Sequence, residues 1–128
     1  DGFCLQGGTK GNAASGDDAS LTPIVGEFSS NGIENKLASS FEKGTVAMAR
    51  TNAVNSATST FFITLASSDA VSKSLDGKYA AFGTIDEAGM KTVDTIVADS
   101  LPAVSDQQMG TISDESKMPV IESVTIVD

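Results

Sequence analysis

Few residues in this chain have side chains suited to nucleophilic or metal chemistry, and their types exclude several reaction classes. The sequence contains no histidine and one cysteine, Cys4, so it offers neither a Ser/His/Asp or Cys/His triad nor a Cys/His zinc site. The glycine-rich run 7–11 lacks the Gly-Lys-Ser/Thr ending of a phosphate loop, and Asp17-Asp18 lacks the spacing of a calcium loop. We therefore expect chemistry that needs neither a side-chain nucleophile nor a metal or cofactor.

The most informative segment runs from Gly44 to Leu65. It contains a β-branched strand within 44–51, a bend of small residues, and a strand within 56–65 that carries two adjacent phenylalanines. Because neighbouring side chains on a strand point to opposite faces, at most one of Phe61 and Phe62 can line a pocket while the other fills the core. The grouping can build an apolar pocket beside exposed backbone, although core packing alone would also explain either ring.

Short strands separated by turn residues are the elements that would position these groups. Residues 45–50 and 60–65 are the clearest strands and should be central, because they are rich in β-branched and aromatic side chains. Asp76-Gly77 predicts a tight turn before a further strand. The other predicted strands are 3–6, 24–28, 79–86 and 119–127.

One segment is convincingly helical. Met90, Val93, Ile96 and Val97 recur at helical spacing and predict an amphipathic helix over 89–99 that plugs or flanks the sheet. The remaining segments are predicted to be connections: 9–22, 29–43 and 101–118.

Length and charge limit the domain count and the partners. A chain of 128 residues with 40% hydrophobic content is long enough for one core and predicts a single domain over 1–128. Its formal charge of −9 would repel phosphate backbones and anionic lipids, so nucleic acid and membranes are not expected partners. The sequence shows neither a signal peptide nor a membrane span, which favours a cytoplasmic location, with a secreted or surface-anchored longer form as the alternative.

Four motifs, taken in order, resemble the cyclophilin family of peptidyl-prolyl isomerases; they lie at 2–8, 44–51, 56–65 and 75–83. The resemblance implies a mainly-β fold, an antiparallel β-barrel with a flanking helix. In the family the opening strands and first helix precede the position of Asp1, so the barrel is expected to be incomplete at the N-terminus of this chain. Either the chain is a shortened form, or a second segment or copy completes the barrel.

The resemblance also implies catalysis of rotation about Xaa-Pro bonds in proline-containing peptides and unfolded proteins, without a cofactor. The rotation barrier is about 18–20 kcal/mol, because the twisted amide loses its partial double-bond character. A catalyst must therefore favour the twisted state over both planar states. A donor to the freed nitrogen lone pair is the natural device.

Site roles follow by matching positions. The resemblance seats the proline ring among apolar side chains, gives Gln6 a hydrogen bond near the substrate carbonyl, and makes the backbone of 49–51 the partner of the residues before proline. Tyr79 can donate at the rim, and Thr60 replaces a glutamine that usually supports the pocket. In the alternative interpretation, Gln6 has no role toward a substrate and only forms hydrogen bonds with backbone groups at the end of a strand. The implied catalytic residue is Gln6, and the implied substrate-binding residues are Phe3, Cys4, Ala49, Arg50, Thr51, Thr60, Phe62, Leu75 and Tyr79.

Two departures from the family pattern matter. The arginine that donates to the proline nitrogen lies upstream of Asp1 in the family, and Arg50, the only arginine here, matches a position that contributes mainly backbone contacts. Ser74 replaces a tryptophan associated with tight cyclosporin binding, so cyclosporin binding is expected to be weak. Two alternatives stay open: a non-catalytic proline-peptide-binding or chaperone module, and an acidic β-rich adhesion or structural domain.

Overall fold

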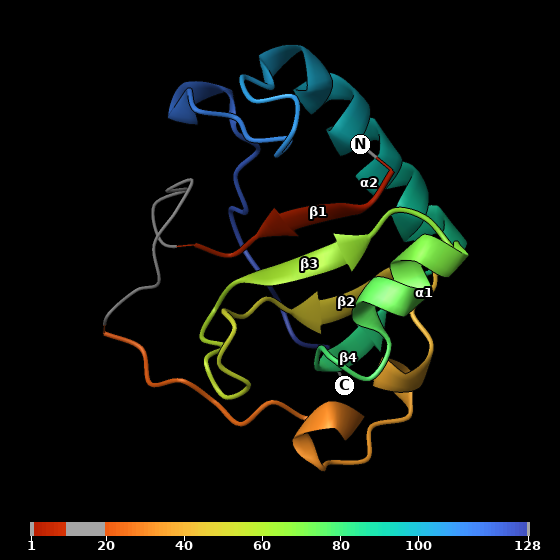
Figure 1. Cartoon of the computed structure of the whole chain (residues 1–128). Helices are drawn as coiled ribbons and strands as arrows, with labels where there is room; N and C mark the ends of the chain where they lie inside the picture. Colours follow the sequence, from red (N-terminus) through yellow and green to blue (C-terminus); the bar gives the residue numbers. More distant parts are fainter. Residues whose placement is uncertain (1, 10–19, 128) are drawn as a thin grey trace.

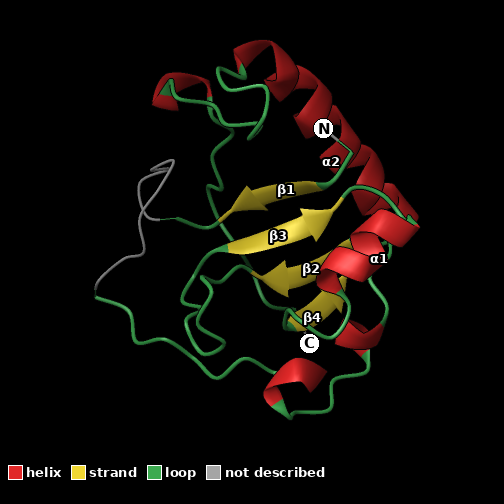
Figure 2. Cartoon of the chain, in the orientation of Figure 1, coloured by secondary structure: helices red, strands yellow, loops and turns green. Residues whose placement is uncertain are grey.

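The computed structural model describes residues 2–9 and 20–127, and they form one antiparallel sheet with two α-helices (Figures 1 and 2). The strand order is β1-β3-β2-β4. The inner strands β2 and β3 are the two that the sequence predicts to be central. The strands are β1 (Cys4–Gly7), β2 (Thr45–Met48), β3 (Phe61–Thr64) and β4 (Ala81–Thr84).

One face of this sheet is buried and the other is only half-covered. Ala47 and Gln6 both lie opposite Phe62 in the register, so the three side chains share a face. Phe62 is buried while its neighbours Phe61 and Ile63 are half-buried, which confirms that the two phenylalanines point to opposite faces.

The two α-helices differ in what they cover. Helix α1 (Asp69–Leu75) lies in front of the sheet in Figure 1, and its buried Val71 and Leu75 belong to the same hydrophobic cluster as Phe62. Helix α2 (Glu87–Ser100) confirms the helix predicted over 89–99 and buries Met90 and Val93. It passes the start of β1 and the end of β3 (Figure 2).

Helix α1 is absent from the sequence-based prediction. Its signals were present but short: the Ser68 side chain accepts a hydrogen bond from the Val71 amide at 3.3 Å, and Val71 and Leu75 lie four residues apart. Two apolar residues in seven give too little periodicity for a confident helix. Four 3-10 turns complete the described chain: Ser29–Asn31, Leu37–Ser39, Leu101–Ala103 and Glu115–Lys117.

The strand predicted over 24–28 does not form. Only Ile24 makes a bridge, donating its amide to the Ala57 oxygen at 2.9 Å, while the Gly26 amide donates to the side chain of Asn55 at 3.0 Å. A Cβ at Gly26 would overlap the Phe28 ring and a nearby carbonyl. The backbone at residue 26 lies so close to these atoms that only glycine fits. This local packing takes the place of the backbone pairing that a strand would make.

The strand predicted over 119–127 is also not formed. Its apolar side chains stay in solvent, with Val124 83% and Ile126 90% exposed. Alternation of apolar and polar residues makes a sequence compatible with a strand. A strand forms only when a neighbouring strand pairs with its backbone N–H and C=O groups.

The sheet is not closed into a barrel. Within the described residues, β1 pairs with β3 and β4 pairs with β2, and the two strands lie at opposite ends of the strand order. The prediction of a mainly-β antiparallel architecture with a flanking helix is confirmed, and the prediction of a barrel is not met by this chain alone. Most of the predicted connection 9–22 lies outside the described residues.

None of the helices in the described part of the chain is both long enough and apolar enough to cross a bilayer.

Candidate functional site

Phe62 is the centre of the group of residues assigned to the site. It extends from the middle of β3 on the buried face and is 4% exposed. Its ring stacks on that of Phe41, with centroids 6.2 Å apart and an angle of 16° between the planes. Tyr79 meets the same ring edge-on, with centroids 5.5 Å apart at 89°. Both arrangements are favourable for aromatic pairs and fix the orientation of the Phe62 ring.

Most of the apolar residues assigned to the pocket belong to, or pack against, the buried hydrophobic cluster that contains Phe62. Leu75 closes helix α1 and is 3% exposed within the same cluster. Cys4, Ala49 and Tyr79 are partly buried and pack against it. Four chain segments that are distant in sequence therefore contribute to one apolar group.

The turn before β4 positions Tyr79. Gly77 adopts a left-handed conformation with φ 66°, donates its amide to the Ala38 oxygen at 2.6 Å, and accepts from the Ser30 amide at 2.9 Å. The Asp76 carboxylate accepts from the Phe41 amide at 2.8 Å. The predicted Asp76-Gly77 turn is confirmed, and it ties the Phe41 and Tyr79 sides of the stack together.

Arg50 lies over two aromatic rings. Its guanidinium carbon is 5.0 Å from the centroid of Phe28 and 4.7 Å from that of Tyr79. Its Nε donates to the Lys78 oxygen at 2.9 Å, and its Nη1 donates to the Thr51 oxygen at 2.9 Å. The arginine side chain is thus engaged within the chain.

The backbone of 49–51, assigned to pair with a peptide, already makes internal hydrogen bonds. The Ala49 amide donates to the Thr60 oxygen at 2.9 Å, and the Thr51 amide donates to the Ser56 hydroxyl at 3.0 Å. A docked peptide cannot use these two donors unless an internal bond breaks. Main-chain docking here would therefore use the other backbone groups of the segment.

The remaining assigned residues lie around the cluster without joining its core. Gln6 is exposed on β1, directly opposite Phe62 in the register. Thr60 is 9% exposed just before β3, and Thr51 is exposed. Phe3 precedes β1, is 43% exposed, and is not part of the buried cluster. The structure therefore brings Phe62, Leu75 and Tyr79 together, whereas Phe3 is exposed.

The pKa of Cys4, one of the residues assigned to the site, is shifted by its surroundings. Burial raises the pKa of its thiol, so the neutral form is favoured and the side chain acts as a small apolar group. No group of three or more Asp, Glu, Cys or His side chains that could hold a metal ion occurs among the described residues.

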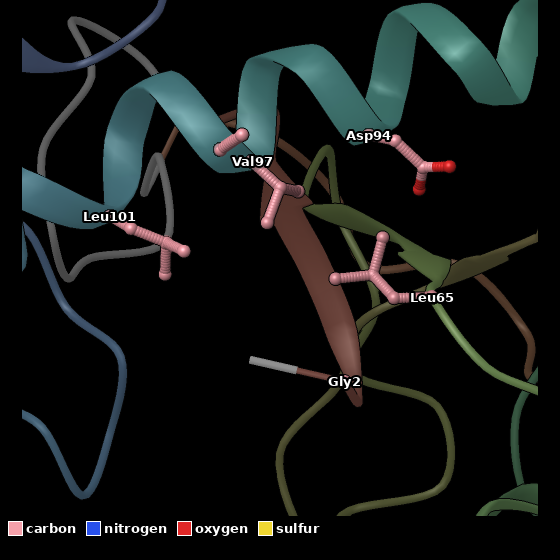
Figure 3. A pocket seen from close by; sticks show the side chains of 6 residues that line it. Gly2, Leu65, Asp94, Val97 and Leu101 are labelled. Carbon is pink, nitrogen blue, oxygen red and sulfur yellow. The ribbon is translucent and has the colours of Figure 1, made fainter.

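Two open cavities lie along helix α2. One, of about 260 Å³, is lined by Gly2, Leu65 and side chains of the helix and its end; Val97 and Leu101 point toward Leu65 in Figure 3. The other, of about 350 Å³, is lined by residues that include Lys43, Ile85 and Met90. Neither is lined by any residue assigned to the site.

Sequence reasoning missed Phe28, Phe41 and Asp76 as parts of this group. Phe28 and Phe41 are each fully or almost fully buried, at 0% and 1% exposure. Phe28 ends the strand predicted over 24–28, and Phe41 lies within the connection predicted over 29–43. Each is a single aromatic residue between polar neighbours, so no periodicity marks it. Their isolation in polar sequence is the signal that could have found them.

Comparison with known proteins gives a consistent result. The family model described as cyclophilin type peptidyl-prolyl cis-trans isomerase/CLD matches residues 1–126. A peptidyl-prolyl cis-trans isomerase of Acinetobacter baylyi is 40% identical over 95 residues, which are 73% of this chain and 46% of that protein. Peptidyl-prolyl cis-trans isomerase A of Dickeya dadantii is 33% identical over 128 residues, 98% of this chain and 60% of that protein. The chain thus spans about half to three-fifths of the length of these relatives.

Proposed function

The chain belongs to the cyclophilin-type peptidyl-prolyl cis-trans isomerase family, and we propose that it takes part in isomerising Xaa-Pro bonds of peptides and unfolded proteins. The observation that carries this proposal is the family match over residues 1–126. Phe62, Leu75 and Tyr79, which the resemblance assigns to the site, lie in or against one apolar cluster, and this supports the proposal. The names of both relatives support it.

The proposed mechanism needs only binding and hydrogen bonding. An apolar site around Phe62 would hold the proline ring, and the backbone near Arg50 would hold the preceding residues in an extended form. Gln6, which shares the face of Phe62, would bond near the substrate carbonyl, and the Tyr79 hydroxyl would donate at the rim. These contacts lower the barrier only as far as they favour the twisted amide over both planar forms.

The donor to the proline nitrogen is proposed to come from outside residues 1–128. Arg50 is the only arginine in the chain, and its donors face the Lys78 and Thr51 oxygens. The free side of β1 offers an edge on which a preceding strand can pair. We propose that such a strand closes the barrel and supplies the donor.

The second candidate function is a peptide-binding module without catalysis. The engagement of Arg50 favours it, because the described residues then provide an apolar group and a docking edge without a cation aimed at the substrate. In this function the chain would hold proline-containing segments and leave the rotation rate unchanged.

A coupled proline-peptide assay separates the two functions. It should compare the 128-residue chain with a version extended by the segment encoded before Asp1, together with a titration of each protein by the same peptide. Activity only in the extended version supports isomerisation with an added donor. Binding without activity in both versions favours the module, and loss of binding in both overturns both functions.

Cyclosporin binding is proposed to be weak. Ser74, which stands where tight-binding members carry tryptophan, is exposed on α1 and donates its hydroxyl to the Ala70 oxygen at 2.8 Å. It offers no indole surface to the ligand. Cyclosporin affinity in the extended version that equals the tightest family members would contradict this.

A further inference from the structure

Arg50 connects two rings that the sequence does not link. Phe28 is fully buried, and Tyr79 is half-buried next to Phe62. The guanidinium lies 5.0 Å from the centroid of the first ring and 4.7 Å from that of the second, within the range of about 6 Å at which a cation is attracted to a ring face. The side chain therefore joins a fixed buried ring to the ring at the edge of the site.

Hydrogen bonds set the orientation of the guanidinium. Nε donates to the Lys78 oxygen, in the peptide group that precedes Tyr79, and Nη1 donates to the Thr51 oxygen. One planar group thus holds both the backbone and the ring of Tyr79. The three ion pairs that the described residues form all use lysines, at positions 43, 91 and 117, so carbonyls and aromatic rings are the groups that face the Arg50 charge.

The contacts of Tyr79 show what this arrangement holds in place. The edge of its ring meets Phe62 at 5.5 Å, and Phe62 stacks on Phe41 at 6.2 Å. The groups form a row in the order Phe28, Arg50, Tyr79, Phe62 and Phe41. If Arg50 releases Tyr79, the one half-buried ring of the row can turn toward solvent, because Phe28, Phe62 and Phe41 are all nearly fully buried.

We propose that Arg50 is a positioning residue that holds the Tyr79 ring against Phe62 and thereby sets the shape of the peptide site. This role rests on the proposed function. It is separate from the backbone role of residues 49–51, because it belongs to the guanidinium. Lysine can perform it only in part, since an ammonium group is attracted to a ring but lacks the planar fork that stacks on the ring while donating to two carbonyls.

The chain contains one tyrosine and no tryptophan, which makes the proposal directly measurable. The tyrosine band in near-UV circular dichroism therefore reports Tyr79 alone. Three variants are compared with the 128-residue chain: Arg50→Met keeps the aliphatic stem, Arg50→Lys keeps the charge, and Lys91→Met removes an exposed charge on α2 as the matched control. Far-UV circular dichroism establishes that each variant is folded.

The expected result is a strong loss of the tyrosine band in Arg50→Met, a partial loss in Arg50→Lys, and no change in Lys91→Met. Affinity for a proline-containing peptide should fall about three- to tenfold in Arg50→Met, the size of a partly desolvated cation–π contact. If Arg50→Met does not fold, Arg50→Lys decides the question, because a full tyrosine band in that variant overturns the planar contact.

An unchanged tyrosine band in folded Arg50→Met overturns the proposal. A lost band with unchanged peptide affinity also overturns it, since the held ring would then not shape the site. Absence of peptide binding in the unmodified chain and in the extended version, with the band still dependent on Arg50, overturns the proposed function and leaves the contact between Arg50 and Tyr79 standing.

Discussion

The two faces of the sheet differ in how completely this chain covers them. On the face of Phe62, helix α1 and the buried Phe28 and Phe41 enclose the strand residues. On the other face Val46, Met48, Phe61 and Ile63 are only half-buried, and the apolar side chains of 119–127 lie in solvent. Apolar side chains left exposed in this way are typical of a region that another segment or protein covers.

This difference suggests which region carries the stability of the isolated chain. Burial of apolar surface is the main favourable term in folding, so the Phe62 face should dominate. Changes there should unfold the chain, whereas changes in the tail should matter only when a partner covers it.

Replacement of Phe62 by alanine should have the largest effect. The ring is 4% exposed and contacts both Phe41 and Tyr79, so its removal leaves a cavity and should cost about 3–5 kcal/mol of unfolding free energy. Met48→Ala, at a half-buried position, should cost less. Urea denaturation measures both values.

The same pair of variants tests the site. In variants that remain folded, Phe62→Ala should weaken binding of a proline peptide more than Met48→Ala does. Equal losses of affinity that simply follow unfolding would show that Phe62 serves only the core.

Replacement of Asp76 by alanine should have the next largest effect. Its carboxylate accepts the Phe41 amide at 2.8 Å and links the turn before Tyr79 to the aromatic stack. A buried donor left without its charged acceptor costs about 1.5–3 kcal/mol. Asp76→Asn keeps a side-chain acceptor and should lose less than half as much in the same denaturation experiment. Equal losses in the two variants would contradict the role of this hydrogen bond.

The central elements could be predicted because local composition and tertiary position agree there. Residues 45–50 and 60–65 are β-branched or aromatic and do form the inner strands, and the spacing of Met90, Val93, Ile96 and Val97 does mark a helix. Propensity and burial act in the same direction in these segments.

Elements that depend on a partner could not be predicted in the same way. Residues 24–28 have strand composition, yet the Asn55 side chain takes the Gly26 amide that a ladder would need. Residues 119–127 alternate like a strand but pair with no strand among the described residues. The residues of the site could be proposed from the family resemblance. The stacking of Arg50 on Phe28 and Tyr79 could not, because these residues are far apart in sequence and meet only in the folded chain.

Cys4 should show a smaller effect, visible as a pH dependence. Burial raises the pKa of its thiol above the ordinary thiol range. As the pH rises through that range, the unfolded chain loses the proton first, so the Cys4 contribution to the stability of the folded chain should fall with rising pH. Below that range the thiol is protonated in both states and contributes no pH dependence.

Two measurements check this behaviour of Cys4. Iodoacetamide should alkylate Cys4 in the folded chain at mildly alkaline pH several-fold more slowly than in the unfolded chain, because the thiolate is the reactive form. Cys4→Ala should remove the alkaline loss of stability that this thiol causes. Equal alkylation rates in the folded and unfolded chains would show that the thiol is not protected.

The smallest effect is expected in the tail. Ile126 is 90% exposed, so Ile126→Ser removes almost no buried surface and should change the unfolding free energy of the 128-residue chain by less than about 0.5 kcal/mol. The same substitution in the version extended before Asp1 should be clearly destabilising if the added strands cover residues 119–127, because the side chain would then be buried. An equally small change in both versions would mean that the tail stays uncovered in the extended version. The difference in coverage between the two faces of the sheet would then persist in the longer protein.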